Sequence, residues 1–374
     1  MKILFAGGGT GGHFYPLIAV ARSIYKIAEQ RKIAKVDIFL MADDPMDSDL
    51  LFKEHIKFMK IPAGKIRRYF SLLNISDFIK TFFGIISSFR KIYSLLPDIV
   101  FSKGGYSSFP VLFSARLLKI PVIIHESDSV PGLVTTWSGK WADRVAISFT
   151  ESGRFFDQKK IINSGNPIRS GVAGGNLEEA VQHFNLEENV STILITGGSQ
   201  GSEKINEAIL SIIPQMVLKY QIIHQTGVKN FSDVSSRTKV ILESTALKHR
   251  YHIVPFLSEG DLKNASRAAS LVLSRASAGA IFEIAAWRLP SILIPLSNSA
   301  QNHQRENAYN YAKTGACEVL EENNLTPNIL LAQIDKILNN QEKIGKMKEG
   351  AASFARSDSA DIIAQEIINL GIHE

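Results

Sequence analysis

The sequence predicts an α/β fold made of two doubly wound parallel sheets, each forming its own domain. Short runs of β-branched residues alternate with longer stretches of helical periodicity along the whole chain. This alternation starts again near the middle, and each half opens with a strand, a glycine-rich turn and a helix. Because 374 residues are too many for one compact core, two Rossmann-like domains of ordinary size are expected.

In the N-terminal half, short apolar runs predict buried strands and periodic stretches predict helices. The strands are expected at Ile3–Ala6, Val36–Met41, Asp98–Ser102, Val122–His125 and Arg144–Ser148. Helices are expected at Leu17–Gln30 and Ser107–Leu118. Repeated strand–helix units of this kind indicate a parallel sheet.

The second half follows Gly171–Asn176, a glycine-rich segment without periodicity that we interpret as a linker. Its strands are expected at Thr192–Thr196, Gln221–His224, His252–Val254, Leu271–Ser274 and Ser291–Ile294. Doubly wound sheets bind ligands at the carboxyl ends of their strands, so two such halves predict facing crevices.

Composition and charge narrow the class of protein. Hydrophobic residues make up 45% of the chain and charged residues 21%, which is typical of a globular protein. The single cysteine, Cys317, excludes an intrachain disulfide framework and favours a reducing compartment. No stretch approaches the ~20 apolar residues of a membrane span, and Met1–Ala6 lacks the features of a signal peptide. The net charge of +6 favours anionic partners, but no nucleic-acid-binding motif accompanies it.

Two glycine-rich turns are candidate phosphate cradles, at residues 7–12 and 197–201. Glycine lets backbone amides approach an anion, and the start of the following helix adds partial positive charge. Gly7, Gly9 and Gly12 also fit the dinucleotide pattern, but the acidic residue expected ~20 positions later is missing. Tight turns that serve only strand–helix packing remain the structural alternative.

Several further motifs follow in a fixed order. They are Gly8-Gly-Thr-Gly-Gly-His13-x-x-Pro16, Gly104-Gly-Tyr106, His125-Glu126-x-x-Ser-Val-Pro-Gly132, Gly165-Asn-Pro-Ile-Arg169, Gly197-Gly-Ser-Gln-Gly201, Glu283-Ile-Ala-Ala and Asn302-His-Gln304-x-x-Asn307. Together they resemble the MurG family within glycosyltransferase family 28, whose members convert lipid I to lipid II in peptidoglycan synthesis. The resemblance extends from residue 3 to about residue 320, and the combination of motifs is highly specific.

The resemblance implies a GT-B architecture, with two Rossmann-like domains facing across a deep cleft. Residues 1–166 would bind the acceptor and associate with the membrane, and residues 167–355 would bind the UDP-sugar. The last helix, about residues 356–374, would pack back on the first domain. The implied reaction is an inverting, metal-independent transfer of N-acetylglucosamine from UDP-N-acetylglucosamine to the C4 hydroxyl of the muramyl sugar of lipid I, without a cofactor.

The same resemblance implies the roles of individual residues. His13 and Glu126 would be catalytic, with His13 either the general base or a positioning group; an imidazole, with an unperturbed pKa of ~6.5, suits a base near neutral pH. The residues implied for acceptor binding are Gly8, Thr10, Gly11, Gly12, Gly104, Gly105, Tyr106 and Asp128. Those implied for UDP-N-acetylglucosamine binding are Thr10, Gly12, Asp128, Arg169, Ser199, Gln200, Glu283, His303, Gln304 and Asn307.

Three departures from the family pattern affect these assignments. Ser127-Asp128 replaces a common Gln-Asn, and the added carboxylate must turn away from a pyrophosphate or find a cation. The small and hydroxyl residues ahead of Glu283 are rearranged, which leaves the diphosphate contacts of that helix start open. His303 stands where some members have glutamine. For His125 and Glu126, a structural hydrogen bond is as reasonable as catalysis.

Two segments bear on metal and membrane binding. The Asp-x-Asp at Asp47–Asp49 lies in a polar connection without a third ligand nearby, so a metal site is not expected. The apolar residues of Phe78–Tyr93 would cover about half of a helix circumference, with basic residues close in sequence. This pattern predicts contact with an anionic membrane surface through Ile79, Phe82, Phe83 and Ile86, whereas a well-buried packing helix is the alternative.

The expected partners are therefore UDP-N-acetylglucosamine, undecaprenyl-linked lipid I, the cytoplasmic face of the inner membrane and proteins of the cell-wall machinery. Alternatives within the same architecture are a transferase with another lipid acceptor, such as diacylglycerol, and a UDP-N-acetylglucosamine 2-epimerase. A nucleotide- or lipid-binding protein without turnover is the non-enzymatic alternative, and a nicotinamide-dependent oxidoreductase is a further one.

Overall fold

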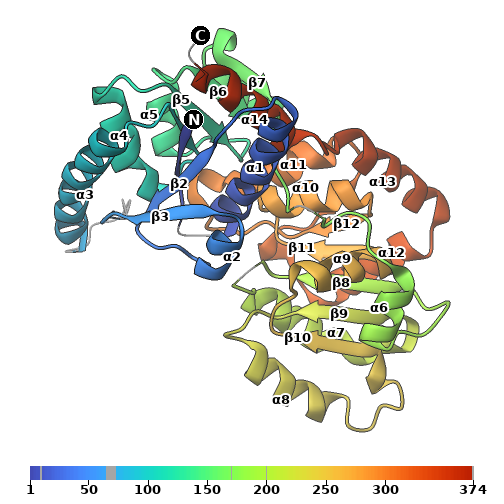
Figure 1. Ribbon diagram of the computed structural model, residues 1–374. Helices are drawn as coiled ribbons and strands as arrows, with labels where there is room; N and C mark the ends of the chain where they lie inside the picture. The colour runs from blue at the N-terminus through green and yellow to red at the C-terminus, as the bar shows by residue number, and fades with distance from the viewer. Residues whose placement is uncertain (9–10, 65–72, 170, 199, 373–374) are drawn as a thin grey trace. The chain divides into compact units, whose positions relative to one another are not determined.

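A computed structural model describes residues 1–8, 11–64, 73–169, 171–198 and 200–372. Its internal contacts divide the chain into two compact units. The N-terminal unit comprises Met1–Arg169 together with Ser357–Glu374, and the C-terminal unit comprises Ser170–Arg356. Each unit is an α/β body with its own parallel sheet and core (Figure 1).

Over the described residues, the N-terminal unit holds a seven-stranded parallel sheet in the order β3-β2-β1-β4-β5-β6-β7. The strands are β1 (Lys2–Ala6), β2 (Asp37–Ala42), β3 (Ile56–Lys60), β4 (Ile99–Ser102), β5 (Val122–Glu126), β6 (Arg144–Ile147) and β7 (Ile161–Asn163). The five strands predicted in this half are confirmed. The two that were not predicted, β3 and β7, form the edges of the sheet, where a short or half-exposed strand has a weak sequence pattern.

Helices cover both faces of this sheet. They are α1 (Gly11–Gln30), α2 (Ser48–Lys53), α3 (Leu73–Leu95), α4 (Phe109–Leu117), α5 (Leu133–Gly139) and α14 (Ser359–Gly371). Successive residues of β1 point to opposite faces, so Ile3 and Phe5 join the core under α1 and α14, whereas Leu4 and Ala6 join the core under α4. Figure 1 shows α1 beside α14 and α3 beside α4.

Over the described part of the C-terminal unit, six parallel strands follow the order β10-β9-β8-β11-β12-β13. They are β8 (Thr192–Thr196), β9 (Gln221–Gln225), β10 (Tyr251–Val254), β11 (Ala269–Ser274), β12 (Ser291–Leu293) and β13 (Cys317–Val319). The five strands predicted here are also confirmed, and the edge strand β13 was missed. The helices are α6 (Leu177–Phe184), α7 (Glu203–Lys219), α8 (Phe231–Ile241), α9 (Glu259–Ala268), α10 (Ala278–Trp287), α11 (His303–Ala312), α12 (Pro327–Leu338) and α13 (Gln341–Phe354).

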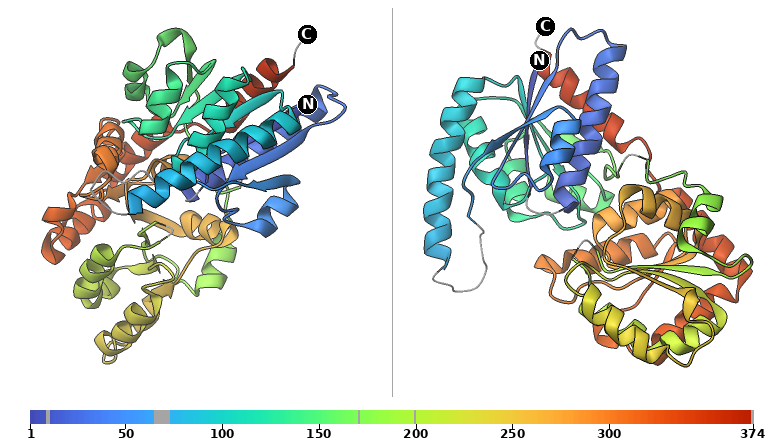
Figure 2. Two further views of the ribbon diagram at one scale, coloured as in Figure 1. Left: turned by 90° about the vertical axis from the view of Figure 1, so that its left-hand side faces the viewer. Right: turned by 60° about the horizontal axis from the view of Figure 1, so that its bottom comes forward.

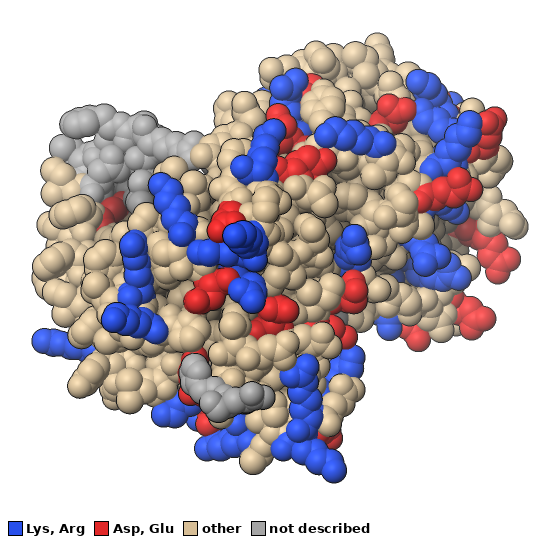
Figure 3. Space-filling model, turned by 90° about the horizontal axis from the view of Figure 1, so that it is seen from above, with Lys and Arg blue, Asp and Glu red and all other residues tan. Residues whose placement is uncertain are grey.

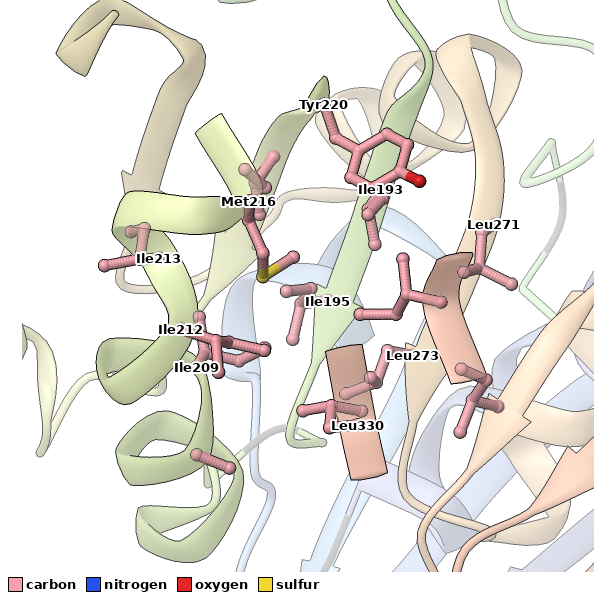
Figure 4. Packing of buried hydrophobic residues seen from close by; sticks show 14 of the residues in the cluster. Ile193, Ile195, Ile209, Ile212, Ile213, Met216, Tyr220, Leu271, Leu273 and Leu330 are labelled. Carbon is pink, nitrogen blue, oxygen red and sulfur yellow. The ribbon is translucent and has the colours of Figure 1, made fainter. Parts of the chain in front are cut away.

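The core of the C-terminal unit lies where α7 and α12 meet the sheet (Figure 4). Ile193 and Ile195 of β8 contribute to the same buried cluster as Ile209 and Met216 of α7. This packing fixes the direction in which α7 leaves the glycine-rich turn after β8, and so it fixes the start of that helix.

The strand orders place both glycine-rich turns at equivalent points. Strand β1 lies between β2 and β4, and β8 lies between β9 and β11, so the strand order reverses beside each of them. Ligands of open parallel sheets bind outside the carboxyl ends of the strands at such reversals. The fold therefore brings the described residues of both turns to the expected binding edge of their own sheets.

Candidate active site

In the N-terminal unit, α1 begins at Gly11, within the first glycine-rich segment. His13 lies in the first turn of this helix, and its Nδ1 is 3.0 Å from the backbone carbonyl oxygen of Lys103. Because a carbonyl only accepts, Nδ1 must carry the hydrogen. In the neutral ring, this tautomer leaves the lone pair on Nε2. Thr10, which the resemblance assigns to both ligands, lies outside the described residues.

The turn after β4 approaches His13 closely because it consists of glycine. A methyl group placed on Gly105 would lie 3.6 Å from His13 Nε2, and Gly104 and Gly105 have φ angles of +75° and +82°. A side chain at either position would be strained. Tyr106 follows at the start of a 3-10 turn, and its hydroxyl donates to Asp43 Oδ2 at 2.8 Å. Burial and this carboxylate raise the pKa of Tyr106.

Lys103, which the sequence analysis did not single out, is the main buried cation beneath these turns. The residue is 2% exposed, and its Nζ lies 2.6 Å from His125 Nδ1, 2.5 Å from Ser127 Oγ and 3.0 Å from Asn166 Oδ1. Burial lowers the pKa of Lys103 to about 7, although Glu126 and Asp128 oppose that change. The only hint in the sequence was that this lysine directly precedes Gly104-Gly-Tyr106. Because lysines are normally exposed, that position did not predict a buried site residue.

His125 is completely buried at the end of β5. Its Nε2 lies 3.0 Å from the carbonyl oxygen of Gly165, so Nε2 donates there and Nδ1 accepts from Lys103. Burial and the nearby ammonium hold the pKa of His125 well below its usual range. This environment supports a structural role for His125, whose neutral ring connects Lys103 to the segment after β7.

Glu126 is only 5% exposed, and both of its carboxylate oxygens are used within the protein. Oε1 accepts from the backbone N–H of Asp128 at 3.0 Å, and Oε2 accepts from that of Gly132 at 3.1 Å. Burial and Asp128 raise the pKa of Glu126 to about 7. This arrangement supports a role in holding the loop between residues 128 and 132, rather than the catalytic contact that the resemblance implies.

Arg169 ends the described part of this unit before residue 170. Its guanidinium lies 5.3 Å from the centroid of the Tyr15 ring on α1, which is within the range of a cation–π contact. The structure thus places Arg169 against the helix that carries His13. Its assignment to the donor remains a prediction.

In the C-terminal unit, the turn after β8 is held from below by Gln225. The side-chain amide of Gln225 donates to the Gly198 carbonyl at 3.0 Å and accepts from Leu257 N at 3.0 Å. A methyl group on Gly201, whose φ is +78°, would lie 2.0 Å from the carbonyl oxygen of Thr226. Gln200 is exposed on this turn, and Ser199 lies outside the described residues.

Helix α7 begins immediately after this turn, with Ser202 as its N-cap. Arg275 Nη2 donates to Ser202 Oγ at 2.6 Å and lies 2.5 Å from Glu322 Oε1, and Nη1 donates to the Ile294 carbonyl at 3.2 Å. Burial would raise the pKa of Glu322, but hydrogen bonds from Ser297 and Arg275 lower it to about 2. Arg275, which belongs to the rearranged segment, therefore anchors the helix start from inside. Glu322 lies in a polar run that gave no sequence signal.

The remaining residues assigned to the donor lie on α10 and α11. Glu283 is half-buried on α10, whose N-cap is Ser277, and His303 is half-buried at the start of α11. Gln304 Oε1 accepts from Leu296 N at 3.0 Å, so this side chain holds the loop after β12. Asn307 is fully buried, and its amide donates to the Ala276 carbonyl at 3.4 Å. That burial favours a positioning role for Asn307 over direct contact with a sugar.

Each unit thus presents a glycine-rich turn and a helix start at the carboxyl edge of its sheet. Backbone amides in such turns can hold the charge of a phosphate or diphosphate without a metal. Of the Asp47–Asp49 pair, Asp47 caps α2 by accepting from Leu50 N at 2.8 Å. Within the described ranges, no group of three or more potential metal ligands comes together.

Family models match both halves of the chain. The N-terminal domain model of glycosyltransferase family 28 matches residues 3–147, and its C-terminal domain model matches residues 192–365. The chain belongs to glycosyltransferase family 28. The resemblance drawn from the motifs is confirmed by these matches, which together span most of the sequence.

Two full-length relatives are each named UDP-N-acetylglucosamine–N-acetylmuramyl-(pentapeptide) pyrophosphoryl-undecaprenol N-acetylglucosamine transferase. The protein of Thermodesulfovibrio yellowstonii is 37% identical over 98% of this chain and 97% of its own length. That of Natranaerobius thermophilus is 33% identical over 99% of this chain and 100% of its own length.

Solved structures show the fold. The MurG of Acinetobacter baumannii matches with a TM-score of 0.74 at 24% identity, over 98% of this chain and 99% of its own. A UDP-GlcNAc 2-epimerase from Neisseria meningitidis, bound to UDP-GlcNAc, matches with a TM-score of 0.68 at 16% identity, over 99% of this chain and all of its own. The predicted fold, two parallel-sheet domains of the GT-B type, is confirmed. At these identities the fold alone does not separate transferases from epimerases.

Proposed function

We propose that this family 28 enzyme transfers N-acetylglucosamine from UDP-N-acetylglucosamine to the C4 hydroxyl of the muramyl sugar of lipid I, forming lipid II. The observation that carries the proposal is full-length identity of 33–37% to proteins with that name. The two glycine-rich turns support it, because both the donor and the acceptor contain a diphosphate. The N-terminal unit binds the acceptor, and the C-terminal unit binds the donor.

The acceptor residues of this proposal are at the carboxyl edge of the N-terminal sheet. Gly8, Gly11, Gly12 and the Gly104–Gly105 turn offer backbone amides to the acceptor pyrophosphate. His13 serves as the general base: Nδ1 donates to the Lys103 carbonyl, which directs proton uptake to Nε2. The acceptor hydroxyl attacks the anomeric carbon, the bond from that carbon to UDP breaks, and the hydroxyl proton passes to His13.

The donor residues surround the start of α7. Gln200 and the turn amides bind the UDP diphosphate, and the helix N-terminus stabilises its charge as UDP leaves. Glu283 accepts hydrogen bonds from the ribose hydroxyls, and His303 contacts the transferred sugar. Gln304 and Asn307 support that contact by fixing the loop after β12 and the segment before α10. One displacement at the anomeric carbon inverts its configuration, so the α-linked donor gives a β-linked product.

Helix α3 supplies the membrane contact of the proposal. Phe78, Ile79, Phe82, Phe83 and Ile86 each expose between 37% and 75% of their surface, so the alternative of a fully packed helix does not fit. Figure 2 shows α3 at the front of its unit in the left view, with one side turned outward. Such an apolar face suits insertion at the headgroup level of a bilayer.

Basic residues accompany this apolar face. Lys80 and Arg90 are exposed on α3, whereas Lys65, Arg67 and Arg68 lie outside the described residues. Among the described residues, no helix is long and apolar enough to cross a membrane. On the face shown in Figure 3, lysines and arginines are interspersed with acidic residues rather than gathered in one basic stripe. We therefore place the enzyme peripherally on the cytoplasmic face of the inner membrane, where a lipid-linked acceptor is reached.

The proposal is tested by measuring UDP release from UDP-N-acetylglucosamine with and without a lipid I analogue. We expect release that depends on the acceptor and is matched by one β-linked disaccharide product for each UDP. Release of UDP without acceptor, together with formation of N-acetylmannosamine, would instead identify an epimerase.

A further inference from the structure

Beneath the acceptor-side turns, the Lys103 side chain connects three segments that meet at the carboxyl edge of the N-terminal sheet. Lys103 follows β4, His125 and Ser127 come from the end of β5, and Asn166 follows β7. Given the proposed transferase function, we propose that Lys103 is a positioning residue, which sets the geometry of His13 and of the loop Ser127–Gly132 for the acceptor.

The hydrogen-bond arrangement suits an ammonium group. His125 Nε2 donates to Gly165, so His125 Nδ1 can only accept, and Asn166 Oδ1 is also an acceptor. Ser127 Oγ is 2.5 Å from Nζ and completes a set of three contacts among the described residues. A charged lysine has three N–H donors, one for each of these atoms.

Lys103 also reaches His13 through its own backbone. The Lys103 carbonyl receives the Nδ1–H of His13, and its backbone N–H donates to the Ala6 carbonyl at the end of β1. A methyl group on Gly7 would lie 3.3 Å from Lys103 Cβ, so the side chain also lies directly against the first glycine turn. The backbone and Cβ of Lys103 thus link its side-chain contacts to the imidazole and to the first glycine turn.

The Ser127-Asp128 pair interacts with the buried charge of Lys103. Glu126 and Asp128 both act on the lysine electrostatically and favour its charged form, while the neutral His125 contacts it directly. Ser127 supplies an acceptor that fits the short distance to Nζ. Lys103 is thus a buried cation whose charged form is favoured by Glu126 and Asp128 and which contacts Ser127 directly.

The experiment compares Lys103→Met, Asp128→Asn and the double variant with the wild type, using Lys53→Met as a matched control on the exposed face of α2. We expect Lys103→Met to lower kcat by about 10- to 100-fold, the order associated with a misplaced catalytic group. Affinity for UDP-N-acetylglucosamine should be unchanged. Asp128→Asn should restore part of the lost kcat in the double variant, because it removes a carboxylate that has lost its counter-charge.

The pH profile separates this role from general structural damage. Attraction between Lys103 and Glu126 is reciprocal, so loss of the ammonium raises the pKa of the carboxyl group and moves the acid limb of kcat to higher pH. A merely structural role would lower kcat equally at every pH. If Lys103→Met does not fold, Ser127→Ala offers a second variant. It removes one hydrogen bond to the ammonium and so disfavours its charged form, which should give a smaller loss of kcat with the same direction of shift.

Normal kcat and an unchanged acid limb in the folded Lys103→Met protein would overturn the inference and leave the proposed function intact. If Lys103→Met does not fold, normal kcat and an unchanged acid limb in Ser127→Ala would overturn the inference. A wild-type protein without acceptor-dependent UDP release would overturn the proposed function, and this inference with it.

Discussion

The two glycine-rich turns follow the same plan but are supported by different buried cations. The acceptor-side turn lies over Lys103, which contacts a neutral histidine and has a pKa lowered to about 7. The donor-side turn leads into a helix start anchored by Arg275, whose carboxylate partner Glu322 has a pKa of about 2. An arginine in such a pair stays charged at every physiological pH, whereas the lysine does not. We therefore expect the acceptor-side turn to respond to pH near neutrality, whereas the Arg275–Glu322 anchor of the donor-side helix should not.

The largest effect is expected from breaking the donor-side pair. Glu322→Ala leaves the guanidinium of Arg275 buried without its carboxylate, which should lower the free energy of unfolding by about 3–5 kcal/mol. Urea denaturation measures this loss. Glu321→Ala is the matched control, since Glu321 forms a surface pair with Arg305 and its removal should have little effect. Equal, small effects of both substitutions would show that Arg275 does not anchor this half.

The second effect concerns the catalytic group on the acceptor side. His13→Ala should lower turnover by ~10²-fold or more, because it removes the proposed general base. UDP-N-acetylglucosamine affinity, measured by calorimetry, should remain at the wild-type value because the donor is assigned to the other unit. Near-normal turnover would remove His13 from the mechanism.

The third effect belongs to the donor side alone. Glu283→Ala should weaken UDP binding by roughly 1.5–3 kcal/mol, the range for hydrogen bonds to a charged group. Glu342→Ala, on the exposed surface of α13, serves as the control in the same titration. Unchanged UDP affinity in the Glu283 variant would contradict the assignment of the ribose hydroxyls to this carboxylate.

The smallest effect on turnover is expected at the membrane face. Ile79→Ser together with Phe83→Ser should reduce liposome co-sedimentation and turnover on a long-chain acceptor, while turnover on a short, soluble acceptor is retained. Phe52→Ser is a suitable control, since Phe52 is 84% exposed on α2 of the same unit. Added salt should weaken membrane binding of the wild type. Equal loss of activity on both acceptors would show that α3 contributes to stability instead.

Sequence patterns were sufficient to predict the inner strands of both sheets. Strands such as β1, β4, β8 and β11 are buried on both faces and therefore read as short continuous apolar runs. The edge strands β3, β7 and β13 were missed because they are short or carry exposed residues, and their pairing depends on neighbours distant in sequence.

The site was predicted less completely, for a physical reason. Motifs singled out the turns, His13 and Glu283 as candidates, since glycine and histidine in a fixed order are distinctive. Lys103 and Glu322 were missed because charged residues are normally exposed, and only the tertiary structure shows that each is buried against partners. The roles of Glu126 and Asn307 likewise depended on hydrogen bonds to backbone groups that no sequence pattern shows.

The most direct test of the proposed division between the two halves is one pH series on the same protein. UDP-N-acetylglucosamine binding and turnover on a lipid I analogue are measured between about pH 6 and pH 8. The nucleotide sugar suits this better than UDP, since its diphosphate is esterified at both ends and does not titrate near neutrality. We predict that above pH 7 the donor dissociation constant stays constant while turnover falls, as Lys103 loses its proton. On the acid side turnover also falls, as Glu126 becomes protonated. Donor affinity that falls together with turnover would contradict the account.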